Sequence, residues 1–241
     1  MTHDLESDRG ALRGWSAVVT GGSRGIGRAT AVALAGAGAR VVTVSRTIDE
    51  AAVPGVTGIA VDLAAAGGCD RVVATVASML GGGGPDILVN NAGMFELHRI
   101  DETDPATFDA MLTLNLTVPF RLVRALVPGM RSRGRGHVVT VGSVADHVAF
   151  PENGAYSAGK YGVRALHEVL REELRRTGVR TTLVSPGAVD TPLWEAIDRA
   201  RHPGLPIRAA MLSAEAVADA ILYAVTRPGD VAIEEMRLGR S

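Results

Sequence analysis

The sequence predicts an α/β fold: a single doubly wound, Rossmann-type domain with a parallel sheet of about seven strands and helices on both faces. Its apolar strand segments lack the period-two alternation of strands with one solvated face, which indicates burial on both faces. Helical segments separate these strands, as parallel connections require. No linker or internal repeat divides the 241 residues, a length that fits one large domain.

The first half of the chain alternates strand and helix candidates. We expect strands at residues 17–20, 40–44, 58–61 and 86–90, and helices at 28–35, 70–80 and 104–130. Glycines follow the first two helices, as helix ends favour. Pro119 lies inside the third helix and predicts a bend there.

The second half continues the alternation. We expect strands at residues 137–141, 180–184 and 231–233, and helices at 155–177 and 213–226. Ser213 is the expected N-cap of the last helix. Residues 1–13 are polar and predict a flexible arm before a domain at 14–241, and the polar, proline-containing stretch 193–212 predicts a flap over a pocket.

Composition argues against several kinds of partner. The net charge is -1 and the densest basic run, residues 131–135, is short and is expected as a solvated loop, so we expect no nucleic-acid partner. Cys69 is the single cysteine, which excludes an intrachain disulfide, and the histidine spacing predicts no metal. The chain shows no signal-peptide pattern and no apolar run that we expect to span a bilayer, so we predict a cytoplasmic protein without a membrane partner.

The chain has 25 positively charged residues, and Lys160 is the only lysine among them. Tyr156 precedes it by four positions, a spacing that places both side chains on one face of a helix. A neighbouring ammonium favours phenolate and is expected to lower the tyrosine pKa, so that the phenol can donate and accept a proton. The alternative is coincidence, because the same spacing occurs on exposed helices.

A glycine-rich turn follows the first expected strand. It contains Gly21, Ser23, Arg24, Gly25, Ile26 and Gly27. Glycines allow the backbone to approach a pyrophosphate, and the N–H groups of the helix that follows would bind it. The alternative is an ordinary turn between a strand and a helix.

The end of the second strand indicates which dinucleotide would bind. NAD-binding versions of this fold place a carboxylate there for the ribose 2′-hydroxyl, whereas this chain has Ser45 and Arg46, with no acidic residue before Asp49. Together with Arg24, Arg46 would bind a 2′-phosphate. The sequence therefore favours NADP(H), the alternative being that both arginines are surface residues.

Two further polar positions follow strands. Asn90 ends the fourth strand within Asn-Asn-Ala-Gly and can hydrogen-bond backbone or ribose, although such runs also form ordinary turns. Ser143 lies just past the fifth strand and thirteen positions before Tyr156. Its hydroxyl is expected near the start of the helix that carries Tyr156.

In combination these motifs resemble the short-chain dehydrogenase/reductase family, in its short single-domain branch. The resemblance covers about residues 14 to 192. It is carried by the Thr-Gly-x-x-x-Gly-x-Gly turn, Asn90 to Gly93, Asn115, Ser143, Tyr156-x-x-x-Lys160 and Pro186-Gly187, in family order.

The resemblance implies a catalytic role for four residues. Tyr156 would exchange a proton with the substrate oxygen, and Ser143 would hold that oxygen. Lys160 would bind the nicotinamide ribose and lower the tyrosine pKa, and Asn115 would hold a water that relays protons to Lys160. Hydride transfer would belong to the nicotinamide.

The resemblance also implies the cofactor contacts. Asp62 would contact the adenine with Leu63 beside it, whereas Val189 and Thr191 would fix the carboxamide. The remaining implied cofactor residues are Asn90, Ala92, Gly93, Tyr156, Lys160, Pro186 and Gly187, besides those of the glycine turn and Ser45 with Arg46.

The substrate pocket is expected from loops without a motif. Its candidate residues are Met94, Phe95, Val144, His147, Phe150 and Trp194. The C-terminal stretch lacks the Asp-Gly-Gly ending of acyl-carrier-protein reductases, which argues against fatty-acid synthesis.

We therefore expect an NADP(H)-dependent oxidoreductase acting on a ketone or secondary alcohol, such as a metabolite-tailoring ketoreductase. The resemblance suggests a homotetramer, or else a dimer. The alternative function is a non-catalytic NADP(H)-binding sensor on the same fold, although a sensor has no need of Ser143, Tyr156 and Lys160 together.

Overall fold

The computed structural model describes residues 10–48 and 53–241, and its centre is a seven-stranded sheet in the order β3-β2-β1-β4-β5-β6-β7. Every neighbouring pair of strands is parallel. The strands are β1 (Ser16–Thr20), β2 (Arg40–Ser45), β3 (Val56–Ala60), β4 (Ile87–Asn90), β5 (Gly136–Val141), β6 (Val179–Pro186) and β7 (Glu235–Leu238). The predicted fold class is confirmed.

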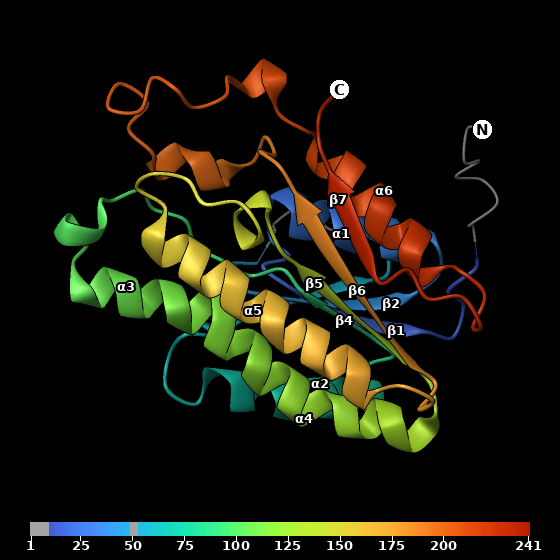
Figure 1. The fold of residues 1–241 in the computed structure, drawn as a ribbon. Helices are drawn as coiled ribbons and strands as arrows, with labels where there is room; N and C mark the ends of the chain where they lie inside the picture. Colours follow the sequence, from blue (N-terminus) through green and yellow to red (C-terminus); the bar gives the residue numbers. More distant parts are fainter. Residues whose placement is uncertain (1–9, 49–52) are drawn as a thin grey trace.

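Helices cover both faces of this sheet (Figure 1). They are α1 (Gly25–Gly36), α2 (Gly68–Leu80), α3 (Pro105–Leu112), α4 (Val118–Arg133), α5 (Gly154–Glu173) and α6 (Ala214–Val225). Val19 of β1 packs in the core shared with α1 and α6, whereas its neighbour Val18 packs in the core shared with α2 and α4. Because successive strand residues enter two different cores, both must be apolar, which explains why the strands show no alternation.

The helix expected at 104–130 is interrupted. A π-helical turn at Thr113–Thr117 separates α3 from α4. Pro119 lies in the first turn of α4, directly after the π-helical turn, and has no N–H to donate to that turn. The irregularity predicted at Pro119 is therefore the π-helical turn just before it.

The same stretch corrects an expectation about membranes. The helical region Pro105–Arg133 is long and apolar enough to cross a bilayer by length and composition alone. Leu122, Leu126 and Met130 of α4, however, are buried in the core against the sheet. Core helices of globular proteins meet the same criterion, so we interpret α4 as a core helix.

The last strand lies later than expected, at 235–238 rather than 231–233. In residues 231–233, backbone carbonyl groups accept hydrogen bonds from side chains of β6 and not from its backbone. The Thr182 hydroxyl donates to the Ile233 carbonyl at 2.6 Å, and the Arg180 guanidinium donates to the Val231 carbonyl at 2.9 Å. Regular pairing with β6 begins only at Glu235.

Two predicted peripheral segments also differ in detail. Residues 1–9 of the expected arm lie outside the described residues, but Leu12 is buried and its N–H donates to Ala37, so the folded part begins before residue 14. The flap at 193–212 contains short 3-10 turns. His202 in this flap pairs with Glu152 at 3.0 Å, which ties the flap to the loop before α5.

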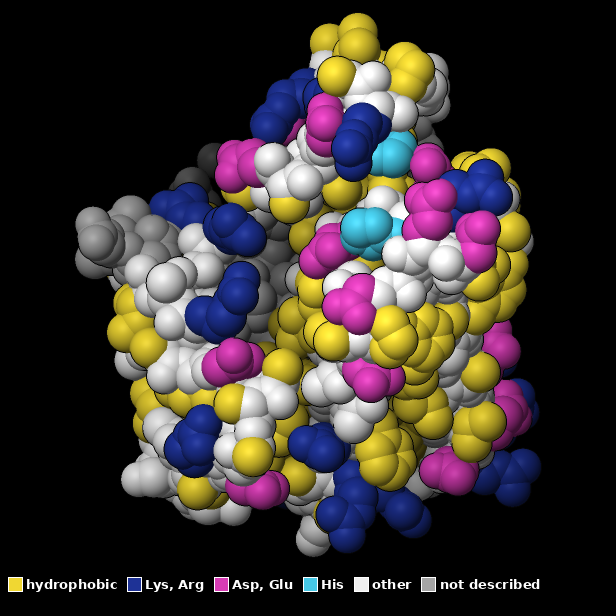
Figure 2. Space-filling model, turned by 90° about the vertical axis from the view of Figure 1, so that its left-hand side faces the viewer, with side chains coloured by type: hydrophobic (Ala, Val, Ile, Leu, Met, Phe, Trp, Pro, Cys, Tyr) yellow, Lys and Arg dark blue, Asp and Glu magenta, His cyan; other side chains and the backbone are white. Residues whose placement is uncertain are grey.

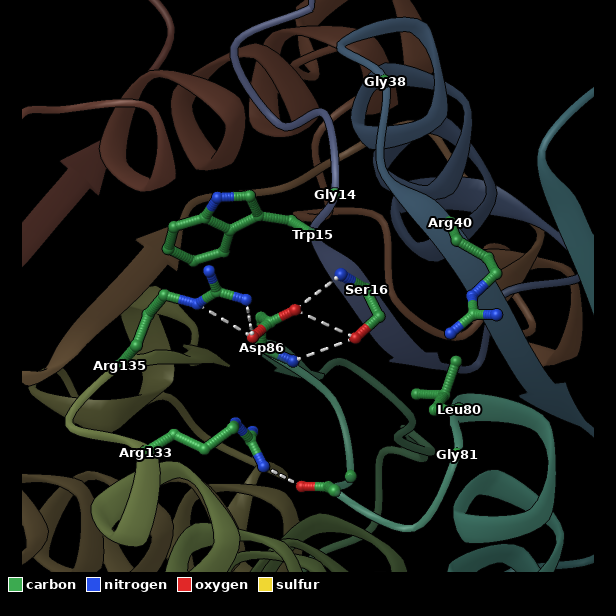
Figure 3. Close-up of a pocket in the computed structure, with 12 residues that line it drawn as sticks. Gly14, Trp15, Ser16, Gly38, Arg40, Leu80, Gly81, Asp86, Arg133 and Arg135 are labelled. Carbon is green, nitrogen blue, oxygen red and sulfur yellow. Dashed lines mark hydrogen bonds and ion pairs between the residues drawn. The ribbon is translucent and has the colours of Figure 1, made fainter.

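At the amino ends of the strands, Asp86 organises a charged cluster beside a cleft of about 360 Å³ (Figure 3). Its carboxylate accepts from the backbone and hydroxyl of Ser16 and from Arg135. Arg133 donates to two carbonyl groups of the loop before β4. The run 131–135, expected as a solvated loop, is thus the end of α4 and the turn into β5, and its arginines bond to the loop before β4 and to Asp86.

Two buried histidines make stability dependent on pH. Burial lowers the pKa of His137 to about 3 and that of His167 to about 4, whereas both would accept a proton near about pH 6.5 in the unfolded chain. Since the unfolded chain binds more protons, stability is lost as the pH falls below 6.5, by about 2 kcal/mol per histidine at about pH 5. Denaturant unfolding measured from neutral to acid pH will show this loss.

His137→Gln and His167→Asn can keep the hydrogen bonds to Thr182 and Thr140 without titrating, because Gln places its amide near the Nε2 position and Asn near the Nδ1 position. Each variant should flatten the pH dependence. His98→Gln is the matched control, because that side chain is 42% exposed and its replacement should leave the slope as in the unmodified protein. Equal slopes in all four proteins would contradict the prediction.

Candidate active site

The predicted site residues gather at the carboxyl ends of the central strands, as ligand sites do in open parallel sheets. Ser143 follows β5, Asn90 ends β4 and the glycine turn follows β1. Figure 2 shows this end of the molecule, where the segment 193–212 forms the protruding upper lobe and the surface is hollowed beside it.

The predicted catalytic side chains are brought together. The Ser143 hydroxyl forms a side-chain hydrogen bond with Tyr156. The Lys160 ammonium lies 5.6 Å from the centre of the Tyr156 ring and donates to the Val141 carbonyl at 2.8 Å. Lys160 is only 6% exposed, so the one lysine of the chain is a buried cation at the end of β5.

The electrostatics of this group differ from the sequence-based expectation. Burial raises the pKa of Tyr156 to about 12, although the hydrogen bond from Ser143 opposes the shift. Burial also lowers the pKa of Lys160 to about 8. Desolvation therefore outweighs the expected stabilisation of phenolate by the ammonium, and the Tyr156 phenol stays protonated at neutral pH.

Asn115 occupies the π-helical turn between α3 and α4. Its side-chain amide donates to the Met94 carbonyl at 2.9 Å and its oxygen accepts from the Met94 N–H at 3.2 Å. A Cβ at Gly93 or Gly159 would come within 2.7 Å or 3.0 Å of the Asn115 side chain. Asn115 thus fills the space between the loop after β4 and the helix that carries Lys160.

The glycine turn leaves the start of α1 open. The N-cap Arg24 makes no side-chain cap, so the first N–H groups of the helix remain available to an anion. A Cβ at Gly27 would come within 2.2 Å of the Gly21 carbonyl oxygen. Gly21 itself has φ +67, a value that glycine adopts readily.

The sequence analysis did not single out Asn91, which braces this turn. Its amide donates to the Thr20 carbonyl at 2.8 Å, and its backbone N–H donates to the Thr20 hydroxyl at 3.0 Å. The Ala92 N–H donates to the same hydroxyl at 3.0 Å. The start of the glycine turn and the Asn-Asn-Ala run after β4 thus form one hydrogen-bonded unit. The only sequence signal for this link was that both segments follow the carboxyl ends of predicted strands.

Several groups at the site are suited to a dinucleotide. Asn90 is buried, and neither its amide nitrogen nor its oxygen has a hydrogen-bond partner within the described part of the chain; buried polar atoms of this kind normally require one. Arg24 and Arg46 are exposed and, among the residues that the structure describes, neither guanidinium has a partner. The residues present therefore fit a cofactor with a ribose and a phosphate.

The other predicted cofactor residues line the same edge. Asp62 accepts from the Ala64 N–H at 2.9 Å, and Leu63 is buried beside it. The Ser45 hydroxyl instead donates within its own turn, to the Thr47 carbonyl.

Beyond β6, the segment after Pro186 returns toward the glycine turn. Gly187 bonds to the Leu238 carbonyl at 2.8 Å, and Val189 is buried. Thr191 lies next to Gly25: a Cβ added at Gly25 would come within 3.1 Å of the Thr191 methyl group.

Aromatic rings form one wall beside Tyr156. The Phe95 ring meets Tyr156 edge to face at 4.8 Å and Trp194 at 5.3 Å. Trp194 is held by a 2.9 Å bond from its indole to the Val189 carbonyl. These contacts connect the flap to the reaction site and give the pocket an apolar side.

The remaining pocket candidates contribute unequally. Val144 and His147 are half-buried in the turn after Ser143. Met94 contacts Asn115 through its backbone. Phe150 is 44% exposed, and the structure shows no ring contact for it among the described residues, so it is not part of the aromatic wall.

The sequence analysis also missed Asp146, which is fully buried three residues after Ser143. Its carboxylate accepts from the Ser143 N–H at 3.1 Å, while the Ser143 hydroxyl accepts from the Ala145 N–H at 3.2 Å. This capping box fixes the position of Ser143. The Ser-x-x-Asp spacing was the available signal.

Comparison with known proteins identifies the family. A sequence model of the short chain dehydrogenase family matches residues 16–202. An uncharacterized oxidoreductase of Staphylococcus haemolyticus is 33% identical over 232 residues, which cover 93% of this chain and 96% of the relative. The D-beta-hydroxybutyrate dehydrogenase of Cupriavidus necator is 34% identical over 210 residues, covering 83% of this chain and 81% of the relative.

Solved structures agree with the sequence comparison. A metagenomic short-chain oxidoreductase in complex with NADP has a TM-score of 0.79 and 31% identity, and the match covers 96% of this chain and 99% of that one. The chain also has the seven-stranded sheet and the glycine turn expected from the resemblance. The protein therefore belongs to the short-chain dehydrogenase family and is an oxidoreductase.

Proposed function

We propose that the protein is an NADP(H)-dependent oxidoreductase that transfers hydride between nicotinamide and a ketone or secondary alcohol, with Tyr156 as the general acid and base. The observation that carries this proposal is the buried group of Ser143, Tyr156 and Lys160, in which the serine hydroxyl bonds to the phenol and the ammonium lies 5.6 Å from its ring.

The geometry supports a proton-transfer role for these side chains. With its pKa at about 12, Tyr156 is protonated at neutral pH and can donate to a carbonyl oxygen that accepts hydride. Ser143 can bond to the same oxygen and hold it near the phenol. In alcohol oxidation the proton would move in the opposite direction, and the positive charge of Lys160 would stabilise the phenolate.

The bound cofactor would supply or accept the hydride, while this chain binds and orients it. The open start of α1 and the unpartnered amide of Asn90 support pyrophosphate and ribose binding. Arg24 and Arg46 support NADP(H) over NAD(H), because a guanidinium binds a phosphate through paired charged hydrogen bonds. A solved relative in complex with NADP is consistent with this preference.

The apolar wall of Phe95 and Trp194 supports a substrate with a hydrophobic part next to its carbonyl group. Such a pocket suits a metabolite-tailoring ketoreductase. A panel of ketones, aldehydes, quinones and β-keto esters is the appropriate set of substrates for the assay.

Tyr156→Phe should remove most turnover, by roughly a thousandfold or more, and leave NADPH affinity nearly intact. The phenyl ring keeps the contact with Phe95 but has no proton to donate. NADPH oxidation with the carbonyl panel and NADPH binding by calorimetry would measure the two effects.

Tyr161→Phe is the matched control for this prediction, because Tyr161 lies on the same helix and is 44% exposed. It should retain full activity. Substantial activity in Tyr156→Phe would exclude the proton-donor role, and tight NADPH binding without turnover by the unmodified protein would favour the sensor function.

Arg46→Asp should shift the preference from NADPH toward NADH by roughly a hundredfold, since a carboxylate repels a 2′-phosphate and accepts from a 2′-hydroxyl. Arg40→Asp is the matched control, because Arg40 begins the same strand at its opposite end. The ratio of kcat/KM for the two cofactors measures the effect, and an unchanged ratio in Arg46→Asp would refute the 2′-phosphate assignment.

We also propose that the protein is a homotetramer that assembles through α4 and α5. Phe120 is 48% exposed, Tyr161 is 44% exposed and Val169 is 56% exposed, all on these two helices. Figure 2 shows hydrophobic side chains gathered on the right of the view, on the side of the molecule where α4 and α5 lie in Figure 1. Exposed apolar faces of this kind favour association.

Val169→Glu should convert the tetramer to smaller species, because it would bury a carboxylate in an apolar interface. Sedimentation velocity measures the change. Val231→Glu is the control, since Val231 is similarly exposed, at 42%, but lies after α6. A monomeric unmodified protein would contradict the proposal.

A further inference from the structure

Asp146 is a buried carboxylate that receives four hydrogen bonds next to the catalytic group. One oxygen accepts from the Ser143 N–H at 3.1 Å and from the Ser185 hydroxyl at 2.5 Å. The other accepts from His147 at 2.6 Å and from Arg164 at 3.3 Å. The side chain has no exposed surface, so these four donors replace the water that an ionised carboxylate would otherwise bind.

The site is built around this carboxylate. An added Cβ at Gly142 would come within 2.3 Å of one Asp146 oxygen and 2.7 Å of the Ser185 hydroxyl. The strand end that leads to Ser143 therefore lacks a side chain at the position where Asp146 packs. Burying a charge in this way is costly unless it is compensated, and here the four donors compensate it.

A chain of ion pairs connects Asp146 to the last strand. The Arg164 guanidinium pairs with Asp146 at 3.3 Å and with Glu235 of β7 at 2.9 Å. It also pairs with Glu168, one turn further along α5. The Arg164 side chain is 17% exposed. Arg237 in turn pairs with Glu235. Ser185 at the carboxyl end of β6 bonds to Asp146 directly, and Glu235 at the start of β7 is linked to Asp146 through Arg164. Both strands thus hold the turn that carries Ser143.

The negative charge of Asp146 also acts on both titrating catalytic residues. It raises the pKa of Tyr156, in addition to the larger effect of burial. It raises the pKa of Lys160 too, and so opposes the lowering that burial causes. Other titratable groups surround the carboxylate. Arg164 and His147 both bond to it, and Glu168 and Glu235 pair with Arg164.

We propose that Asp146 is a positioning residue for the catalytic group: its carboxylate holds the turn of Ser143 in place, and its negative charge, which Arg164 partly compensates, acts on Tyr156 and Lys160. The first part depends on hydrogen bonds and the second on charge. The effect of the charge can therefore be tested with variants that each remove one charge, the negative charge of Asp146 or the positive charge of Arg164.

The single lysine allows a direct test without substrate or cofactor. Protein labelled with ¹³C at the lysine ε carbon gives one side-chain NMR signal, because Lys160 is the only lysine. In the unmodified protein this signal should titrate near pH 8. Asp146→Asn removes a negative charge and should lower the midpoint by roughly half a pH unit or more.

Arg164→Met removes a positive charge and should move the midpoint in the opposite direction, to higher pH. This variant keeps the test decisive if Asp146→Asn does not fold. Asp86→Asn is the matched control, because Asp86 is also buried and likewise accepts from a backbone N–H, a serine hydroxyl and an arginine, but at the amino ends of the strands. It should leave the Lys160 midpoint unchanged.

Shifts of opposite sign in Asp146→Asn and Arg164→Met, with none in Asp86→Asn, would establish the charge effect. Unchanged midpoints, or shifts of the same sign in both variants, would overturn it. The holoenzyme gives a second measurement: the midpoint of the pH profile of kcat/KM for alcohol oxidation should fall in Asp146→Asn and rise in Arg164→Met.

This second measurement rests on the proposed function, whereas the NMR titration does not. Activity that survives Tyr156→Phe would refute the proposed function and leave the titration result valid. Loss of activity in Tyr156→Phe, together with an Asp146→Asn variant whose kcat falls at an unchanged pH midpoint, would leave the proposed function intact and reduce Asp146 to a purely structural role.

Discussion

Burial of both faces of the parallel sheet is the constraint on which the rest of this structure depends. Because neighbouring residues of each strand enter different cores, the strands are mostly apolar, and buried polar residues within them, such as His137 and Thr182, bond to each other. Each connection runs back over one face of the sheet as a helix or loop. All strands then point the same way. The carboxyl ends of β1, β4, β5 and β6 therefore meet at one edge of the sheet, where their polar groups gather.

Desolvation at that edge determines the chemistry. Lys160 is buried against the end of β5, and the same burial keeps Tyr156 protonated and weakens the proton affinity of the lysine. A buried pair of this type needs compensating groups. The Val141 carbonyl supplies one for the ammonium, and Asp146 supplies a fixed negative charge whose own compensation extends through Arg164 to β7.

Close backbone packing is the second requirement of the site. Asn91 bonds to the turn that Gly21 and Gly27 form, and Asn115 fills the space that Gly93 and Gly159 leave. Asn115 can reach that position because the π-helical turn displaces the chain between α3 and α4. Such turns are frequent at functional sites. The asparagines and glycines therefore act as complementary parts of one surface.

The sequence alone determined the α/β class and most element positions, because these depend on local composition and period. It also predicted that Tyr156 and Lys160 share a helix face and that Ser143 lies near them, because these depend on fixed spacings, whereas Asn115 was predicted only through the family resemblance. The tertiary structure decided what depends on contacts between distant segments. It interrupted the helix expected at 104–130, moved the last strand to Glu235, and revealed Asn91 and Asp146 as supporting residues. It also reversed the expected direction of the Tyr156 pKa. Spacing indicates which charges are near, whereas only the packed fold determines how much water is removed, and here the loss of water is the larger effect.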